Sequence, residues 1–215
     1  MRAILKSTTN LASFACDTLV IPFYKDLKLN SDSRAIDKAS QKQLAKILAS
    51  DDFKGHSGET VTLRGIAGTA ANRIVLWGLG DQDKLNRQAL VKACDSLAKT
   101  VTALPGKHCA VLGSVKTNKA VPNSWALQQI AARIARTTYL YTTTKPSKKN
   151  PATLARISIV NADSTAANRQ AISQGIAIGQ GINIARELGN LPGNICTPKY
   201  LSAQARKLAD RKSVV

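Results

Sequence analysis

The 215-residue sequence has no long uninterrupted apolar stretch. No window approaches the roughly 18 uncharged apolar residues that a membrane-spanning helix needs. The stretch from Met1 to Phe23 is broken by polar residues, whereas a secretory signal peptide contains a continuous apolar segment. These absences predict a soluble, cytoplasmic protein with no membrane partner.

Cysteine is also scarce, and its four copies are widely spaced. They are Cys16, Cys94, Cys109 and Cys196. No CxxC pair occurs, so the spacing indicates neither a zinc knuckle nor a disulfide framework. We interpret all four as buried, reduced thiols.

Carboxylates are too few and too dispersed for metal chemistry. The chain has 13 acidic residues against 31 basic ones, and beyond Asp95 the only acids are Asp163, Glu187 and Asp210. A two-metal hydrolytic site needs several oxygen ligands around ions roughly 3.5 to 4 Å apart. Neither His56 nor His108 has an evident partner in the sequence. We therefore expect no catalytic residue, no metal ligand and no cofactor in this chain.

A nucleotide-binding loop is also incomplete. Gly78-Leu79-Gly80 follows a predicted strand, but the third glycine of a dinucleotide fingerprint is missing. Asp81 and Asp83 follow where a phosphate would sit. We interpret this segment as a tight turn.

Strand-like and helix-like segments alternate along the chain. Apolar, β-branched runs predict strands at 3–6, 18–23, 60–66, 73–78, 108–112 and 154–160. Helical periodicity predicts helices at 33–49, 85–104 and 124–141, and 142–151 is expected to be a surface loop. Strands separated by helices predict a mixed, largely parallel sheet covered on both faces, which is an α/β fold.

A long helix is expected at 165–190, with its polar residues on one narrow stripe. Such a helix needs neighbours on more than one side. Its small residues leave room for close backbone contact; they are Gly175, Ala177, Gly179, Gly181 and Ala185. Gly189-Asn190 and Pro192 end this helix, and Thr197-Pro198 begin a second one with Leu201, Ala205 and Leu208 on one face.

The run ARELGNLPGNICTPKYLSAQARKLA at 185–209 resembles the junction between the N-terminal and catalytic domains of the leucyl (cytosol) aminopeptidases. GHSGETVTL at 55–63 and RIVLWGLG at 73–80 fall in that family's order and spacing, although Gly193 stands where many members have a second proline. The resemblance implies a macro-like three-layer α/β/α domain at 1–162, a linker helix at 163–190 and the beginning of a truncated catalytic domain at 191–215.

The family's members are metal-dependent exopeptidases, so the resemblance implies hydrolysis of N-terminal residues from peptides by a hexamer that uses two divalent metals, Mn or Zn. The family's metal ligands, and the lysine and arginine that assist catalysis, lie downstream of the junction. The resemblance therefore implies an N-terminal region that is itself inactive and whose partner is the missing catalytic domain.

An alternative hypothesis follows from the charge. The formal net charge is +18, and residues 96–162 contain basic side chains but no acid. Such a segment attracts polyanions, so it could bind duplex DNA; the other interpretation is a solvated basic face. The candidate contacts are Lys116, Lys119, Arg133, Arg136, Lys145, Lys148 and Lys149. Aromatic residues make up only 4% of the chain, so phosphate contact is favoured over base stacking.

Overall fold

The computed structural model describes residues 1–113, 115, 117–144 and 152–209. Its strands form one sheet in the order β1-β6-β5-β2-β4-β3. The strands are β1 (Arg2–Lys6), β2 (Thr18–Phe23), β3 (Thr60–Arg64), β4 (Arg73–Gly78), β5 (His108–Leu112) and β6 (Arg156–Val160). Every neighbouring pair is parallel except β3 with β4. The predicted mixed, largely parallel sheet is confirmed.

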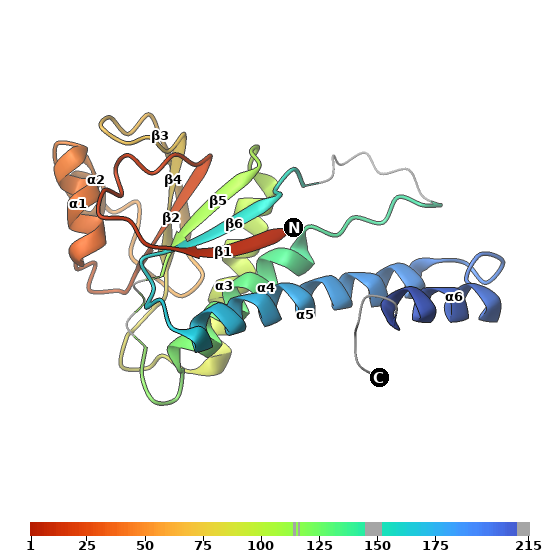
Figure 1. Ribbon diagram of the computed structural model, residues 1–215. Coiled ribbons are helices and arrows are strands. Elements are labelled where there is room, and N and C mark those ends of the chain that lie inside the picture. The colour runs from red at the N-terminus through yellow and green to blue at the C-terminus, as the bar shows by residue number, and fades with distance from the viewer. Residues whose placement is uncertain (114, 116, 145–151, 210–215) are drawn as a thin grey trace.

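Helices cover both faces of this sheet, which gives three layers (Figure 1). The helices are α1 (Ser31–Ala39), α2 (Gln43–Ala49), α3 (Arg87–Ala103), α4 (Asn123–Thr137), α5 (Ala166–Asn190) and α6 (Pro198–Ala209). The central strand β2 alternates between two apolar clusters: Leu19 and Ile21 pack with α1 and α2, while Val20 packs with α3 and α4. Each cluster is a separate half of the core because a strand's side chains alternate between the faces of a sheet.

The single helix expected at 33–49 is in fact two helices. Gln41 and Lys42 have φ angles of 53° and 62°, in the left-handed region that interrupts a right-handed helix. The carboxylate of Asp37 accepts a hydrogen bond from the Ala45 backbone N–H at 2.8 Å, which holds the two short helices together across the turn. The segments expected at 60–66 and 124–141 also end earlier, at Arg64 and Thr137.

Helix α5 packs along α4 through two of its glycines. A Cβ atom at Gly179 would lie 2.6 Å from Ala135 Cβ and 2.7 Å from the Ala132 carbonyl oxygen. A Cβ atom at Gly175 would lie 2.9 Å from Ala131 Cβ. The expected close backbone contact is therefore confirmed at these two positions.

The other small residues of α5 do not serve this contact. A Cβ atom at Gly181 would meet no described atom within 4 Å, and Ala177 and Ala185 are exposed. The expectation was wrong for these three because they lie on sides of the helix that face away from α4.

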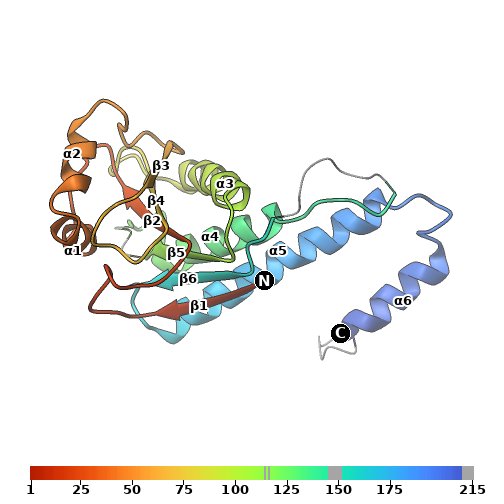
Figure 2. The same ribbon diagram turned by 90° about the horizontal axis from the view of Figure 1, so that it is seen from above.

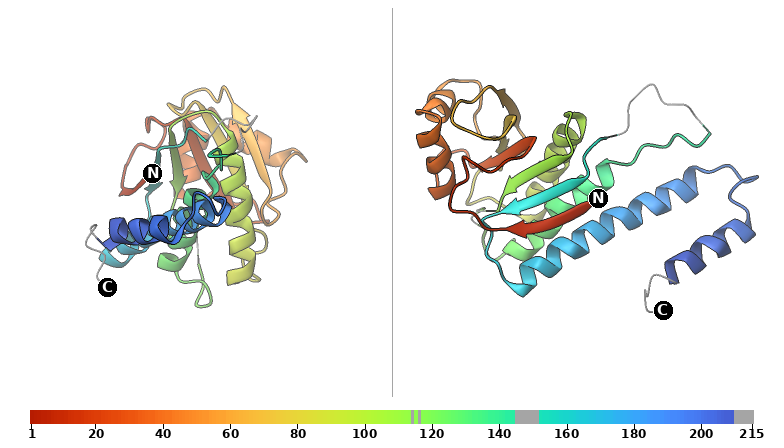
Figure 3. Two further views of the ribbon diagram at one scale, coloured as in Figure 1. Left: turned by 90° about the vertical axis from the view of Figure 1, so that its right-hand side faces the viewer. Right: turned by 45° about the horizontal axis from the view of Figure 1, so that its top comes forward.

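Helix α5 extends past the sheet, and after a short connection α6 turns back without joining the core (Figures 2 and 3). The hydroxyl of Thr197 accepts the Tyr200 backbone N–H at 3.3 Å, as expected for the N-cap of α6. Within the described part of the chain, no helix is long and apolar enough to cross a membrane.

Candidate functional site

The described residues do not supply the ligands for a two-metal site. No three His, Cys, Asp or Glu side chains gather into a group that could hold a metal ion anywhere in the described ranges. Because neutralising two dications takes clustered carboxylates, the residues present do not fit the metals that the family resemblance implies.

His108, at the start of β5, has a structural partner. Its Nε2 lies 2.8 Å from the hydroxyl oxygen of Ser158 on the neighbouring strand β6. Burial, followed by the charge of Arg156, lowers the pKa of His108, so the neutral ring predominates at pH 7. Ser158 is completely buried and cannot meet a substrate. The pair joins two strands and is not a nucleophile with its base.

Three of the four cysteines are buried, as expected. Burial raises the pKa of Cys16 to about 12, and it also raises the pKa of Cys94 and of Cys109. These thiols are therefore protonated and unreactive at neutral pH. Cys196 is only partly buried, so the expectation of burial was wrong there, because it lies in the connection between α5 and α6, outside the core.

The tight turn after β4 is explained by packing. A side chain at Gly78 would clash with the His56 carbonyl oxygen. The Gly58 N–H donates to the Gly78 oxygen at 2.9 Å, and the Gly78 N–H donates to the Glu59 oxygen at 2.8 Å. The glycine therefore allows two backbone segments to approach closely.

The candidate nucleic-acid residues have different surroundings. Arg133 and Arg136 both face Asp95 on α3, at 3.2 and 2.9 Å, and each is about two thirds shielded or more. Lys119 is exposed and makes no ion pair or side-chain hydrogen bond with any described residue. The other candidates lie outside the described residues; they are Lys116, Lys145, Lys148 and Lys149.

Exposed cations also lie at the amino-terminal edge of the sheet, which the sequence did not reveal. Arg2 of β1 is paired in register with Arg156 of β6, and Arg156 is in turn opposite His108 of β5. Lys107 precedes β5, and all three basic side chains are exposed. Parallel strands bring these residues together because they begin at the same edge.

Apolar side chains are exposed on the outer part of α5 and on α6. We call them the C-terminal apolar surface; they are Ile178, Ile182, Ile184, Ile195, Leu201 and Leu208. Ile178 is 45% exposed and Leu201 is 44% exposed. Large apolar groups gathered at one end of a molecule are typical of an interaction site.

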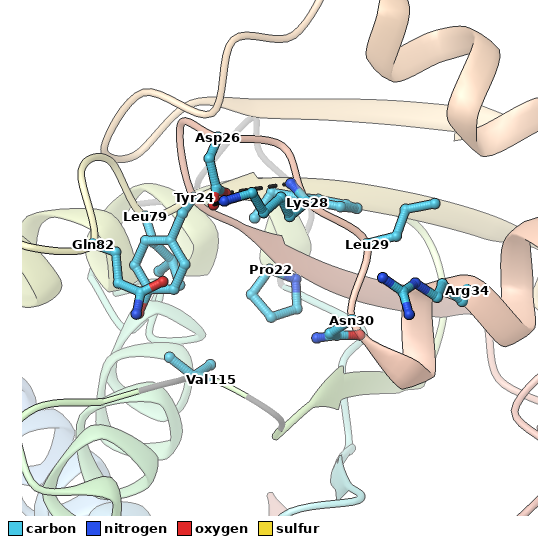
Figure 4. Close-up of a pocket in the computed structure, with 11 residues that line it drawn as sticks. Pro22, Tyr24, Asp26, Lys28, Leu29, Asn30, Arg34, Leu79, Gln82 and Val115 are labelled. Carbon is cyan, nitrogen blue, oxygen red and sulfur yellow. Dashed lines mark hydrogen bonds and ion pairs between the residues drawn. The ribbon is translucent and has the colours of Figure 1, made fainter.

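A cavity of about 360 Å³ lies at the carboxyl end of β2. Pro22 and Phe23 of this strand line it, together with the segment that follows, the start of α1 and the turn after β4. Figure 4 shows Tyr24 and Gln82 on one side of Pro22, with Asn30 and Arg34 on the other.

Comparison with known proteins agrees with this architecture. Several solved structures share the fold, and two of them illustrate it. A mutant of tomato leucine aminopeptidase matches with a TM-score of 0.75 and 21% identity, over 99% of this chain and 43% of that chain. The macro domain of ganglioside induced differentiation associated protein 2 matches with a TM-score of 0.58 and 12% identity, over 82% of this chain and 85% of that chain. The macro-like α/β/α fold is thereby confirmed.

Sequence similarity identifies the family. A probable cytosol aminopeptidase of Nitrosococcus oceani is 35% identical over 198 residues, which are 89% of this chain and 39% of the relative. The chain thus spans about two fifths of the length of the curated relatives it matches. Residues 20–148 match the sequence profile described as "Cytosol aminopeptidase family, N-terminal domain". Because that match covers more than half of the sequence, the chain belongs to the cytosol aminopeptidase family.

Proposed function

We propose that this chain is the accessory N-terminal region of a cytoplasmic, metal-dependent aminopeptidase and does not hydrolyse peptides by itself. In this proposal residues 1–162 are the macro-like domain, 163–190 are the linker helix and 191–215 begin the catalytic domain. Removal of N-terminal residues from peptides, two Mn or Zn ions and hexamer assembly would belong to a protein of the length of its relatives.

The observation that carries this proposal is the C-terminal apolar surface. Leu201 and Leu208 lie seven residues apart, on one side of α6, and both are more than 40% exposed. Fully burying an exposed leucine or isoleucine side chain stabilises a protein by roughly 1.5–3 kcal/mol, and part of that gain remains for these partly exposed side chains, so the set is suited to contact with a further domain. Because relatives are more than twice as long as this chain, a catalytic domain is the partner of matching size.

The attachment of α5 to α4 and to the segment that follows α4 supports the role of a linker. Beyond the two glycines, the side-chain N–H of Asn183 donates to the Ala135 carbonyl oxygen at 3.0 Å. Glu187 accepts hydrogen bonds from the Tyr139 hydroxyl at 2.9 Å and the Thr143 hydroxyl at 2.7 Å. Contacts distributed along α5 hold its outer part in a set direction, so the apolar surface is presented away from the sheet.

An activity assay tests the proposal. The purified chain, supplied with manganese or zinc, is expected not to hydrolyse a leucine anilide above background, because its described residues form no carboxylate cluster. A leucine aminopeptidase in the same buffer is the positive control. Turnover that persists through repurification and rises with added metal would contradict the proposal.

Duplex DNA binding is a second candidate function. The row of exposed cations at the amino-terminal edge favours it, because neutralised phosphates release counterions. The pairing of Arg133 and Arg136 with Asp95 leaves Lys119 as the one described candidate without an acidic partner.

A further inference from the structure

The cavity at the carboxyl end of β2 lies where the chain connections diverge. After β2 the chain passes to α1 and α2 on one face of the sheet, whereas after β4 and β5 it passes to α3 and α4 on the other face. Strands β4 and β5 flank β2 on either side. In open α/β sheets, ligands bind in the crevice that such a reversal opens outside the carboxyl ends of the strands.

The cavity has the size and lining of a small-molecule site. Its volume of about 360 Å³ falls at the lower end of ligand pockets, which measure roughly 300–1,000 Å³. Pro22, Leu79 and Val115 provide apolar surface, while Gln82 and Arg34 bring polar groups from opposite sides (Figure 4). A ligand here would therefore place an apolar body against Pro22 and direct its polar group to one wall.

The charge of the lining favours an anion. Among the described residues two cations line the cavity, Lys28 and Arg34, and Lys28 is paired with Asp26 at 3.2 Å. Arg34 is exposed, and its guanidinium has neither an acidic partner nor a hydrogen bond among the described residues. Burial, followed by the charge of Asp26, raises the pKa of Tyr24 to about 12, so its hydroxyl adds no negative charge at pH 7. The described part of the lining therefore carries one unbalanced positive charge.

The walls are held in place before any ligand arrives. The Leu79 N–H donates to the Phe23 oxygen at 2.8 Å, and the Lys25 N–H donates to the Gly80 oxygen at 2.9 Å. Leu27, in the segment after β2, has a φ angle of 50°, which is unfavourable for leucine, and its N–H donates to the Tyr24 oxygen at 3.0 Å. A preformed wall loses little conformational entropy on binding.

From these features we infer that the cavity binds a small organic anion with a planar or apolar body and a single carboxylate or phosphate group. The planar body lies against Pro22, Leu79 and Val115. The anionic group accepts paired hydrogen bonds from the guanidinium of Arg34, a geometry that arginine provides and lysine does not.

The test is a titration of the whole ¹⁵N-labelled chain with phenyl phosphate and, separately, with benzoate, followed by two-dimensional NMR. At least one of the two is expected to shift the amide signals of Tyr24–Arg34 and Leu79–Gln82 in a saturable way. The tighter ligand identifies the preferred anionic group. Inorganic phosphate has the anionic group without the planar ring, and phenol has the ring without the anionic group. Each is therefore expected to bind about tenfold more weakly, or worse, than the tighter of the two test ligands.

Two variants locate the anion. Arg34→Gln is expected to weaken binding about tenfold or more, because a hydrogen bond to a charged group is lost. Lys38→Gln is the matched control: it removes one positive charge from the exposed side of the same helix, outside the cavity lining, and is expected to change affinity less than twofold or so. Should Arg34→Gln lose its dispersed spectrum, Arg34→Lys keeps the charge and is still expected to lose affinity.

Three results would overturn the inference. The first is the absence of shifts with both phenyl phosphate and benzoate at a ligand concentration of about 10 mM. A ligand that does not bind at this concentration has a dissociation constant too high for a specific site. The second is equal affinity of the wild-type and Arg34 variants. The third is binding of inorganic phosphate as tight as that of phenyl phosphate, which would show that the apolar lining makes no contribution.

Discussion

Gly179 and Gly181 of α5 have opposite effects on the packing of the helix, although nothing in the sequence distinguishes them. Gly179 lies against the α4 backbone, whereas Gly181 lies in open space two residues later. Glycine in a helix interior costs roughly 1 kcal/mol relative to alanine. At Gly179 close helix packing offsets this cost, and at Gly181 no packing with a described residue does.

Alanine substitutions separate the two roles. Gly179→Ala is expected to lower the free energy of unfolding by about 1–3 kcal/mol, because the new methyl group overpacks the contact with α4. Gly181→Ala is expected to leave it unchanged or raise it by up to about 1 kcal/mol through helix propensity. Urea unfolding monitored by circular dichroism measures both. Equal effects of the two substitutions would show that α5 does not pack on α4 through this face.

At the scale of elements, the chain divides into a packed part and a projecting part. Strand β4 is central to both apolar clusters, with Val75 and Leu76 completely buried on opposite faces. Helix α6 is bounded by an exposed connection and contains only exposed and half-buried residues in its described part. Helices of this length are marginally stable in water without tertiary contacts.

Hydrogen exchange tests this division. Amides of α6, and those of α5 beyond Glu187, are expected to exchange many times faster than amides of β4, because their opening needs no disruption of the core. The molecular mass must be measured alongside, since self-association through the C-terminal apolar surface would also protect these amides. Equal protection of α6 and β4 in a proven monomer would contradict the proposed role of this surface.

At the scale of the whole molecule, the excess of positive charge is unevenly placed. The ends of parallel strands gather Arg2, Lys107 and Arg156 at one edge, while Asp95 neutralises part of α4. A basic surface of this kind affects association with any polyanion, and the effect falls with ionic strength.

Salt dependence of DNA binding tests the basic segment. The parent chain is expected to bind duplex DNA with little sequence preference, because phosphate contacts position a protein without reading bases. Replacing Lys145, Lys148 and Lys149 with glutamine is expected to reduce the slope of log affinity against log salt by up to about 3. Fluorescence anisotropy at several salt concentrations measures the slope.

The control for this experiment removes the same charge elsewhere. Lys38, Lys42 and Lys46 are exposed on or beside α1 and α2, so their replacement with glutamine alters net charge equally. If the slope of log affinity against log salt falls equally in both triple variants, the effect comes from net charge and not from a defined surface. Absence of binding by the parent chain at low salt would leave the segment as a solvated basic face.

Most of the strands and helices were predictable, because their periodicity depends on near neighbours. The strand from Arg73 to Gly78 and the helix ending at Asn190 were expected at those residues and are observed there. The break at Gln41 and Lys42 was not expected, because neither residue is a typical helix breaker and the turn depends on Asp37 reaching Ala45. The cavity was missed entirely, since its lining comes from segments separated by up to ninety or so residues.

The sequence by itself determined the α/β class, the end of the long helix at Asn190 and the family, because these follow from local patterns and from motifs within short runs. Only the tertiary structure decided which side chains meet. It brought Asp95 to Arg133 and Arg136, placed Ser158 beside His108, and left the C-terminal apolar surface exposed. Such pairings depend on how distant segments pack, and packing is settled by the complete set of contacts and not by any single stretch of chain.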